Sequence, residues 1–482
     1  MLTNLLRNHT TSFIWFNLGR STALASIILL ILAGCASSPV GETFTPTAKS
    51  ITAQPSATKT ADDYFRQGDA LGQQGNYQAA IKSYDQAIAL NPQYAEALDK
   101  RGEANFHIGD YDHAIIDCSQ AILISPTLAD AYANRGNAYY SKKDFTHALA
   151  DYDKSIELDP LSAQTYSDRG ALFMDQGDEQ HALADYQQAL SVNPQFADAY
   201  YNRGNIYYHR ADLERAFQEY SSAIKYDPSF ASAYLNRGVV YYKQGQIDHA
   251  IVDLNKALSL DPRLVEAYRD RAVMYKAVGE YDKALADYDK MIELDFSSPQ
   301  AYIDRADLLK AQGEYDRAVE DYGQAIVLDP SSVAGFNNRG DAYRQTGRYD
   351  KALADFENVI ALVPDNWIPY HNRGLTQANL GDFERAIVDY SKAISLGPDQ
   401  ANPYAFRGAA YLEQKDYSAA LKDLNKAIGI DAKHGPAYYF RAKVYVETNQ
   451  RELAIQDLQK ALALGLESDL KPQAEALLKR VQ

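Results

Sequence analysis

Residues 197–230 read ADAYYNRGNIYYHRADLERAFQEYSSAIKYDPSF, and this stretch of 34 residues decides the fold. In its first part, Tyr200, Gly204 and Tyr207 fall on one helical face by the i, i+4, i+7 rule, which predicts a helix near Ala197–Arg210. A small glycine on that face lets a second helix approach closely, and the tyrosines fill the space beside it.

The second part of the stretch predicts another helix near Leu213–Tyr226, with Ala216 and Tyr220 on its inner face. Pro228 follows this helix and ends it, because proline cannot continue a helical hydrogen-bond pattern. Between the helices, Ala211 stands where a left-handed turn residue is expected. An alanine in that conformation carries a strain of roughly 1 kcal/mol.

The same pattern recurs every 34 residues from residue 61 onward, without insertion or deletion. Each unit has an alanine in the same phase: Ala80, Ala114, Ala148, Ala182, Ala216, Ala250, Ala284, Ala318, Ala352, Ala386, Ala420 and Ala454. The turn position holds a glycine in eight units: Gly75, Gly109, Gly177, Gly245, Gly279, Gly313, Gly347 and Gly381. Lys143, Lys415 and Asn449 replace it elsewhere, as Ala211 does.

This pattern closely resembles the tetratricopeptide repeat, which has the same period and a matching order of aromatic, glycine, tyrosine, alanine and proline positions. The resemblance implies an all-α fold, a right-handed superhelical solenoid of about twelve helix-turn-helix repeats whose first helices line a concave face. The expected repeats are 61–94, 95–128, 129–162, 163–196, 197–230, 231–264, 265–298, 299–332, 333–366, 367–400, 401–434 and 435–468. Residues 469–482 form an amphipathic stripe that predicts a capping helix over the last repeat.

Residues 1–34 have the layout of a secretory signal, with Arg7 and Arg20, no acid, and then an apolar run. The run ends in the sequence LAGC at 32–35, which resembles the lipobox of bacterial lipoproteins and implies acylation of Cys35. The alternative is an ordinary cleaved signal with a chance cysteine. Residues 35–60 are rich in Ser, Thr and Pro, which predicts a flexible tether.

The resemblance to lipoproteins implies a place in the cell envelope, lipid-anchored and facing the periplasm or the exterior. Ala36 follows the cysteine. In Gram-negative relatives, an aspartate at that place tends to retain a protein in the inner membrane, so its absence favours the outer membrane. Cys118, in contrast, occupies a slot that is usually aromatic in this chain, which predicts a buried structural thiol.

The seventh position of a repeat is usually leucine in the family, but repeats two to twelve have arginine there. An acid follows each arginine sixteen residues later, as with Arg203 and Glu219 or Arg237 and Asp253. A buried unpaired arginine would be too costly to repeat eleven times, so we expect structural ion pairs within each repeat. The alternatives are pairing with the acid of the preceding repeat, or an exposed track for anions.

The resemblance places positions 5, 9 and 12 of the first helices on the concave face. Along this face the side chains change from aromatic to basic, which predicts a groove for a protein segment with apolar and acidic parts. The expected partner-binding residues are Tyr140, Tyr201, Tyr208, Tyr242, Arg269, Lys276, Lys310 and Arg344. Leu235 and Ile303 extend the same stripe.

The net charge of −16 opposes nucleic-acid binding, because an acidic surface repels phosphates. His113, His147, His181 and His249 share one repeat phase, which separates them too widely to ligate one ion and predicts surface positions. The sequence has no phosphate loop, nucleophile elbow or zinc spacing, so we expect no catalysis, cofactor or metal. A scaffold that binds proteins in the envelope is favoured. The alternative is a non-catalytic subunit that recruits a peptidoglycan hydrolase or glycosyltransferase.

Overall fold

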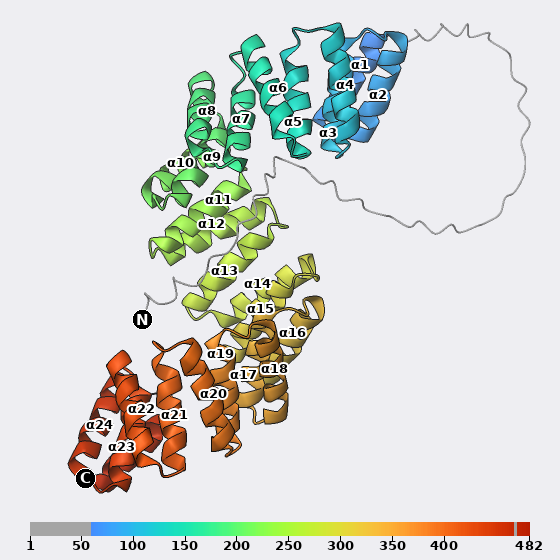
Figure 1. Ribbon diagram of the computed structural model, residues 1–482. Helices are drawn as coiled ribbons and strands as arrows, with labels where there is room; N and C mark the ends of the chain where they lie inside the picture. Colours follow the sequence, from blue (N-terminus) through green and yellow to red (C-terminus); the bar gives the residue numbers. More distant parts are fainter. Residues whose placement is uncertain (1–58, 467–469) are drawn as a thin grey trace, which may run out of the picture. The chain divides into compact units, whose positions relative to one another are not determined.

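The computed structural model describes residues 59–466 and 470–482, which contain twenty-five α-helices and no β-strand (Figure 1). The first helices of the repeats are α1 Ala61–Gln73, α3 Ala95–His107, α5 Ala129–Ser141, α7 Ala163–Asp175, α9 Ala197–His209, α11 Ala231–Lys243, α13 Val265–Ala277, α15 Pro299–Ala311, α17 Val333–Gln345, α19 Trp367–Asn379, α21 Ala401–Glu413 and α23 Gly435–Glu447. The second helices are α2 Tyr77–Leu90, α4 Tyr111–Ile124, α6 Phe145–Leu158, α8 Glu179–Val192, α10 Leu213–Tyr226, α12 Ile247–Leu260, α14 Tyr281–Leu294, α16 Tyr315–Leu328, α18 Tyr349–Leu362, α20 Phe383–Leu396, α22 Tyr417–Ile430 and α24 Arg451–Leu464. The predicted all-α repeat fold is confirmed.

The turn between the two helices of a repeat has the left-handed conformation that the sequence predicts. The backbone angle φ is positive at all eight turn glycines and also at Lys143, Ala211, Lys415 and Asn449. After the turn, Asp212 begins α10, because its side chain accepts a hydrogen bond from the backbone N–H of Arg215. These local features form each hairpin through contacts within the repeat alone.

Inside repeat five, the two helices meet at a glycine and a tyrosine. Tyr220 is fully buried, and a Cβ atom added to Gly204 would lie 2.7 Å from Tyr220 Cε1. Ala216 and Ala223 are also fully buried on the inner face of α10. The small residues therefore set the distance between the helices, and the aromatic ring fills the remaining space.

The contacts divide the chain into two units, Met1–Val240 and Tyr241–Gln482. Within each unit, the first helices of neighbouring repeats contact one another, as α3 does with α5 and α21 with α23. The second helices of neighbouring repeats are not in comparable contact in the described part of the chain. The first helices therefore line the concave side of each unit.

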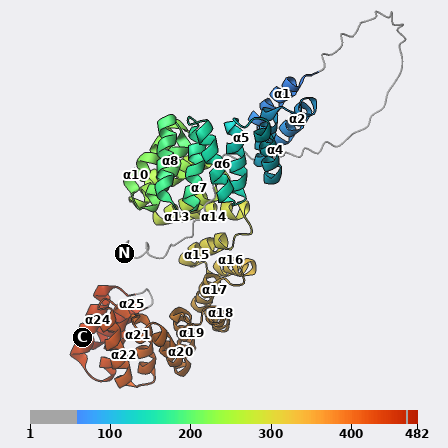
Figure 2. The ribbon, with the colours of Figure 1, turned by 45° about the horizontal axis from the view of Figure 1, so that its top comes forward.

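The last repeat is covered by α25 Leu470–Val481, which lies beside α24 (Figure 2). Ala474 is fully buried in the core formed with Phe440, and Leu477 and Leu478 pack against the same core. The predicted capping helix is thus present. Every helix in 59–466 and 470–482 is too short or too polar to span a bilayer. The predicted signal and lipidated Cys35 lie outside the described residues.

Candidate functional site: the concave face and its C-terminal pocket

The arginine ladder is a set of ion pairs within repeats. In repeat four, Arg169 donates from Nε and Nη2 to the two carboxylate oxygens of Asp185, at 2.8 and 2.7 Å. Asp185 is 5% exposed, and the guanidinium lies 5.8 Å from the ring centre of Tyr166. The same bidentate pair forms at Arg101–Asp117, Arg135–Asp151, Arg271–Asp287, Arg305–Asp321, Arg339–Asp355, Arg373–Asp389, Arg407–Asp423 and Arg441–Asp457.

Repeat five has glutamate in place of aspartate, and the pair changes. Arg203 Nη2 lies 2.9 Å from Glu219 Oε1, but Arg203 Nε and Glu219 Oε2 are buried without a hydrogen-bond partner. Burial raises the pKa of Glu219, although Arg203 opposes this rise. In repeat six, Arg237 donates to Ser221 at 3.3 Å, and Asp253 is 5% exposed. The pairing of Arg237 with Asp253 stays a prediction.

A third ladder, which the sequence reasoning missed, joins the arginines to the preceding repeat. Nη1 of Arg169 donates to Asp153 at 2.6 Å, from repeat four back to repeat three. The residues bonded in this way stand sixteen positions before their arginines: Asp85, Ser119, Asp153, Gln187, Ser221, Asn255, Asp289, Ser391 and Asn425. These nine guanidinium groups therefore link two repeats and are engaged in hydrogen bonds rather than free to bind anions.

The predicted aromatic residues of the first unit lie on its concave side, but their rings are half-buried. The Tyr140 hydroxyl donates to Asp175 of the next repeat at 2.8 Å. The Tyr201 ring packs 4.8 Å from that of Phe230, and Tyr208 packs against the core of repeat five. These side chains thus contribute to the contacts between repeats as well as to the groove surface.

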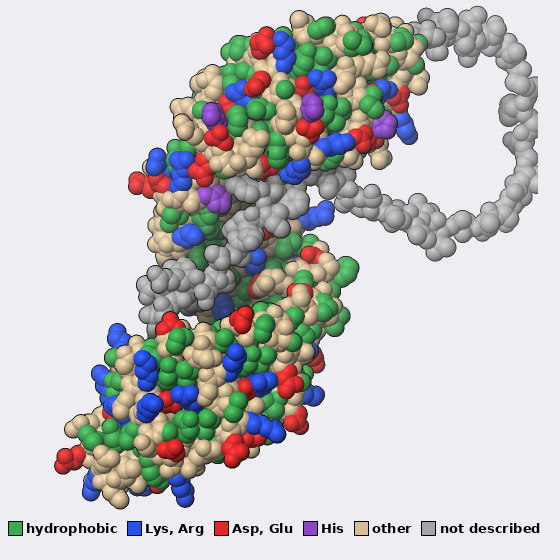
Figure 3. Space-filling view, in the orientation of Figure 1, with side chains coloured by type: hydrophobic (Ala, Val, Ile, Leu, Met, Phe, Trp, Pro, Cys, Tyr) green, Lys and Arg blue, Asp and Glu red, His purple; other side chains and the backbone are tan. Residues whose placement is uncertain are grey.

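The predicted basic residues of the second unit differ in their exposure and in their ion pairs. Lys276 is exposed, whereas Lys310 and Arg344 share Asp341, with N–O distances of 3.5 and 2.6 Å. The effective charge of this part of the groove is therefore smaller than the sequence predicts. On the face shown in Figure 3, acidic and basic side chains are mixed, and neither sign forms a large patch there.

The fifth position of the repeat is not uniformly a groove position. Leu235 and Ile303 are only 8% and 5% exposed, so the expectation that they extend the binding stripe is wrong. Both are apolar and pack against neighbouring core residues instead of facing solvent. Tyr242 and Arg269 are half-buried.

On the concave side, polar side chains at position 9 of some first helices accept a hydrogen bond from the buried tyrosine of the same repeat. Asn205 accepts hydrogen bonds from the Tyr220 hydroxyl at 2.8 Å and from Asn236 of the next repeat at 2.9 Å. In repeat ten, Leu375 takes the place of the acceptor, and the buried hydroxyl of Tyr390 has no hydrogen-bond partner. The tyrosine of repeat ten therefore lacks the partner that Asn205 gives to Tyr220.

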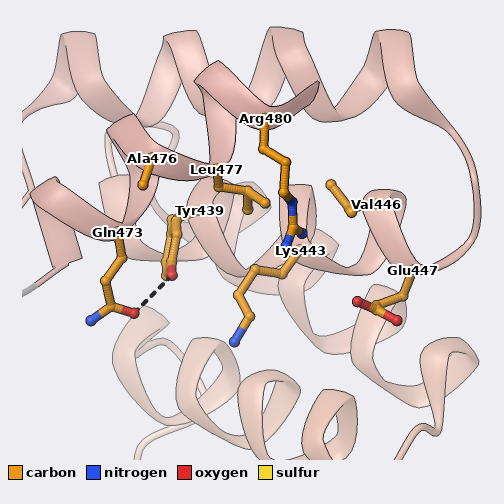
Figure 4. Close-up of a pocket in the computed structure, with 8 residues that line it drawn as sticks. All are labelled: Tyr439, Lys443, Val446, Glu447, Gln473, Ala476, Leu477 and Arg480. Atoms are coloured by element: carbon orange, nitrogen blue, oxygen red, sulfur yellow. Dashed lines mark hydrogen bonds between the residues drawn. The ribbon is translucent and has the colours of Figure 1, made fainter. Parts of the chain in front are cut away.

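A pocket of about 330 Å³ lies at the C-terminal end of this face, between α23 and α25 (Figure 4). Val446, Ala476 and Leu477 contribute its apolar lining. Its polar lining consists of Tyr439, Lys443, Glu447, Gln473 and Arg480. No sequence motif marks this pocket, because its two walls come from the last repeat and the capping helix.

The histidines that share one repeat phase are not brought together. His113 is exposed, and its Nδ1 lies 2.7 Å from Oδ2 of Asp110, the residue that begins its own helix. His147 and His181 make the same contact with Asp144 and Asp178. Within 59–466 and 470–482, no group of three or more His, Cys, Asp or Glu could hold a metal ion. Cys118 is fully buried, and burial raises its pKa, so it is a structural thiol as predicted.

Successive antiparallel helix pairs that pack on one another and have a concave side define an α-helical repeat protein. Family models described as the TPR repeat and the tetratricopeptide repeat match residues 65–129, 129–160, 170–210, 204–245, 231–264, 303–366, 378–415, 401–434 and 435–464. The chain therefore belongs to the tetratricopeptide repeat family. A comparison with curated protein sequences found no match.

Several solved structures are similar to this chain. Yeast Tom70 is 15% identical, with a TM-score of 0.42, over 87% of this chain and 95% of that one. A tetratricopeptide repeat protein from Parabacteroides merdae is 21% identical, with a TM-score of 0.42, over 59% and 98%. Pseudomonas aeruginosa PilF is 22% identical, with a TM-score of 0.40, over 43% and 94%.

Proposed function

We propose that the protein is a scaffold of the bacterial cell envelope, anchored by lipid at Cys35, which binds a partner protein along its concave face. The cations of the second unit support this proposal most directly. Lys276 is exposed on the first helix α13, and Lys310 and Arg344 lie on the first helices α15 and α17, where they share Asp341. The whole chain, in contrast, has a net charge of −16. Cations that gather on a concave face against the overall charge favour a partner with an acidic segment.

The test of partner binding uses the triple variant Lys276→Glu, Lys310→Glu and Arg344→Glu. Cross-linked envelope is captured with the wild type and with the variant, and the bound proteins are identified by mass spectrometry. The folded variant should lose the partner, and wild-type binding should weaken as salt rises. Capture that is unchanged in the variant would place the site elsewhere.

A matched control makes the same charge change on the second helices. Lys283 and Arg317 are exposed and Lys290 is half-buried on α14 and α16, and each is paired with a glutamate three residues away. Their joint replacement by glutamate should leave capture unchanged. Equal loss in both triple variants would show that total charge matters rather than the concave face.

The anchor has its own test. Cys35→Ser removes the thiol that would be acylated, so the protein should move to the soluble fraction or keep its signal uncut. Stable anchoring by lipid needs more than one acyl chain, which diacyl lipoprotein modification would supply. A variant that fractionates and migrates like the wild type would contradict the lipoprotein assignment.

A further inference from the structure

Aromatic rings replace polar side chains at position 6 of the last two repeats. Repeats eleven and twelve have Phe406 and Phe440 there, where repeat ten has Asn372. Both rings pack in the core that also contains Tyr439 and Leu477, two of the residues that line the pocket between α23 and α25.

This pocket has room for one large apolar side chain. Its volume of about 330 Å³ is lined on the apolar side by Val446, Ala476 and Leu477. One wall is fixed by the Tyr439 hydroxyl, which donates to Gln473 Oε1 of the capping helix at 3.2 Å (Figure 4). Most of the lining is polar, so an apolar side chain would contact only the wall that Val446, Ala476 and Leu477 form.

The mouth of the pocket is positive. Lys443 and Arg480 enter it from α23 and α25, respectively. Lys443 is paired with Glu413 at 3.1 Å, but exposed Arg480 has no ion-pair partner among the residues that the structure describes. Glu447 also lines the pocket and lies on the same side as Val446 in Figure 4. A guanidinium without an ion-pair partner, beside an apolar wall, favours binding of a segment in which a carboxylate stands next to an apolar side chain.

We propose that the pocket between α23 and α25 binds a partner segment in which a large apolar side chain stands beside a carboxylate. The apolar side chain fills the cavity against Val446, Ala476 and Leu477, and the carboxylate pairs with Arg480. This site is separate from Lys276, Lys310 and Arg344. It depends neither on these residues nor on the lipid anchor.

The test uses a fluorescein-labelled peptide, Glu-Gly-Phe-Glu-Gly with an amidated C-terminus, and the purified full chain. Binding is measured by fluorescence anisotropy. A second peptide carries the photoreactive benzoylphenylalanine in place of Phe, and its cross-links are mapped by mass spectrometry. We expect saturable binding, cross-links to α23 and α25, and loss of binding when Phe is replaced by Ala or both Glu by Lys.

The chain offers a matched pair of variants on one helix. Arg480→Glu and Lys479→Glu change the charge equally at adjacent exposed positions, but only Arg480 lines the pocket. Arg480→Glu should weaken the affinity for the peptide about tenfold, and Lys479→Glu should leave the affinity unchanged. Ala476→Trp, which fills the cavity from an exposed position, should also abolish binding while the helical circular dichroism is retained.

Three results would overturn the site: no saturable binding of the peptide, cross-links confined to other helices, or equal weakening by Arg480→Glu and Lys479→Glu. The triple variant of Lys276, Lys310 and Arg344 should bind this peptide as the wild type does. Loss of peptide binding in that variant would assign the peptide to the basic groove instead, and would therefore also contradict the separate pocket.

Discussion

The ion pair of Arg169 and Asp185 offers a quantitative test of how the repeats are held together. Arg169 makes two hydrogen bonds to the buried Asp185 and one, of 2.6 Å, to Asp153 of the preceding repeat. The side chain of Asp153 is 56% exposed, so its bond contributes little. The perturbation is Arg169→Leu, which places at this position the residue that is usual in the family.

The expected loss of stability follows from the carboxylate that remains. Without Arg169, Asp185 stays buried at 5% exposure with no cation beside it. An uncompensated buried charge of this kind costs about 3–5 kcal/mol. The lost contacts of the guanidinium with the rings of Tyr166 and Phe173, at 5.8 and 6.0 Å, add about 0.5–1 kcal/mol. The single variant should therefore lose about 3.5–6 kcal/mol of local unfolding free energy.

The double variant Arg169→Leu with Asp185→Leu removes both charges. Replacing a buried pair by apolar residues is close to neutral, so most of the lost stability should return. The measurement is hydrogen exchange of the amides of α7 and α8, supported by urea unfolding of the whole chain, because opening of one repeat is a local event. A single variant that loses less than about 1 kcal/mol, or a double variant as unstable as the single one, would refute this reasoning.

Three further outcomes can be measured by unfolding. Ala211→Gly relieves the strain at φ 58° and should stabilise repeat five by about 1 kcal/mol, whereas the matched Gly177→Ala at φ 77° should destabilise by a similar amount. Gly204→Ala should cost about 1–3 kcal/mol, because the added Cβ meets the ring of Tyr220; unchanged stability would contradict this packing. Burial raises the pKa of Asp99 to about 7, so the folded state holds a proton that the unfolded state has lost, and stability should fall as pH rises from about 4 to 7. Asp99→Asn should remove that pH dependence and gain about 3–4 kcal/mol above pH 7; a wild type whose stability is flat over this range would contradict the shift.

The repeat fold could be predicted from the sequence because each local signal agrees with the others. Helical periodicity, turn residues and prolines all return every 34 residues, so the bounds of α9 and α10 follow almost to the residue. Because the histidines and the acids recur at fixed positions of the repeat, the sequence also indicated that they do not form a catalytic cluster. The strained turn at Ala211 could be placed for the same reason, since its neighbours in phase are glycines.

The binding surface was less predictable, because it depends on contacts between repeats. Position in the repeat indicates which helix faces the groove, but it does not indicate which side chains are used in packing. Leu235 and Ile303 are buried, and Asp341 forms ion pairs with both Lys310 and Arg344. The pocket beside Arg480 could not be predicted either, since it arises where a capping helix replaces a further repeat.

Contacts between repeats also explain why repeat one lacks both members of the ion pair. Arg101 reaches back to Asp85 of repeat one and also binds Asp117 of its own repeat. In repeat one, no helical hairpin precedes Gln67 within the described residues. Ser83, in the place of the acid, satisfies its own hydroxyl by donating to the backbone of its helix and needs no cation. The arginine thus bonds both within its own repeat and to the preceding one, and its loss should loosen mainly its own repeat, where the carboxylate partner is buried.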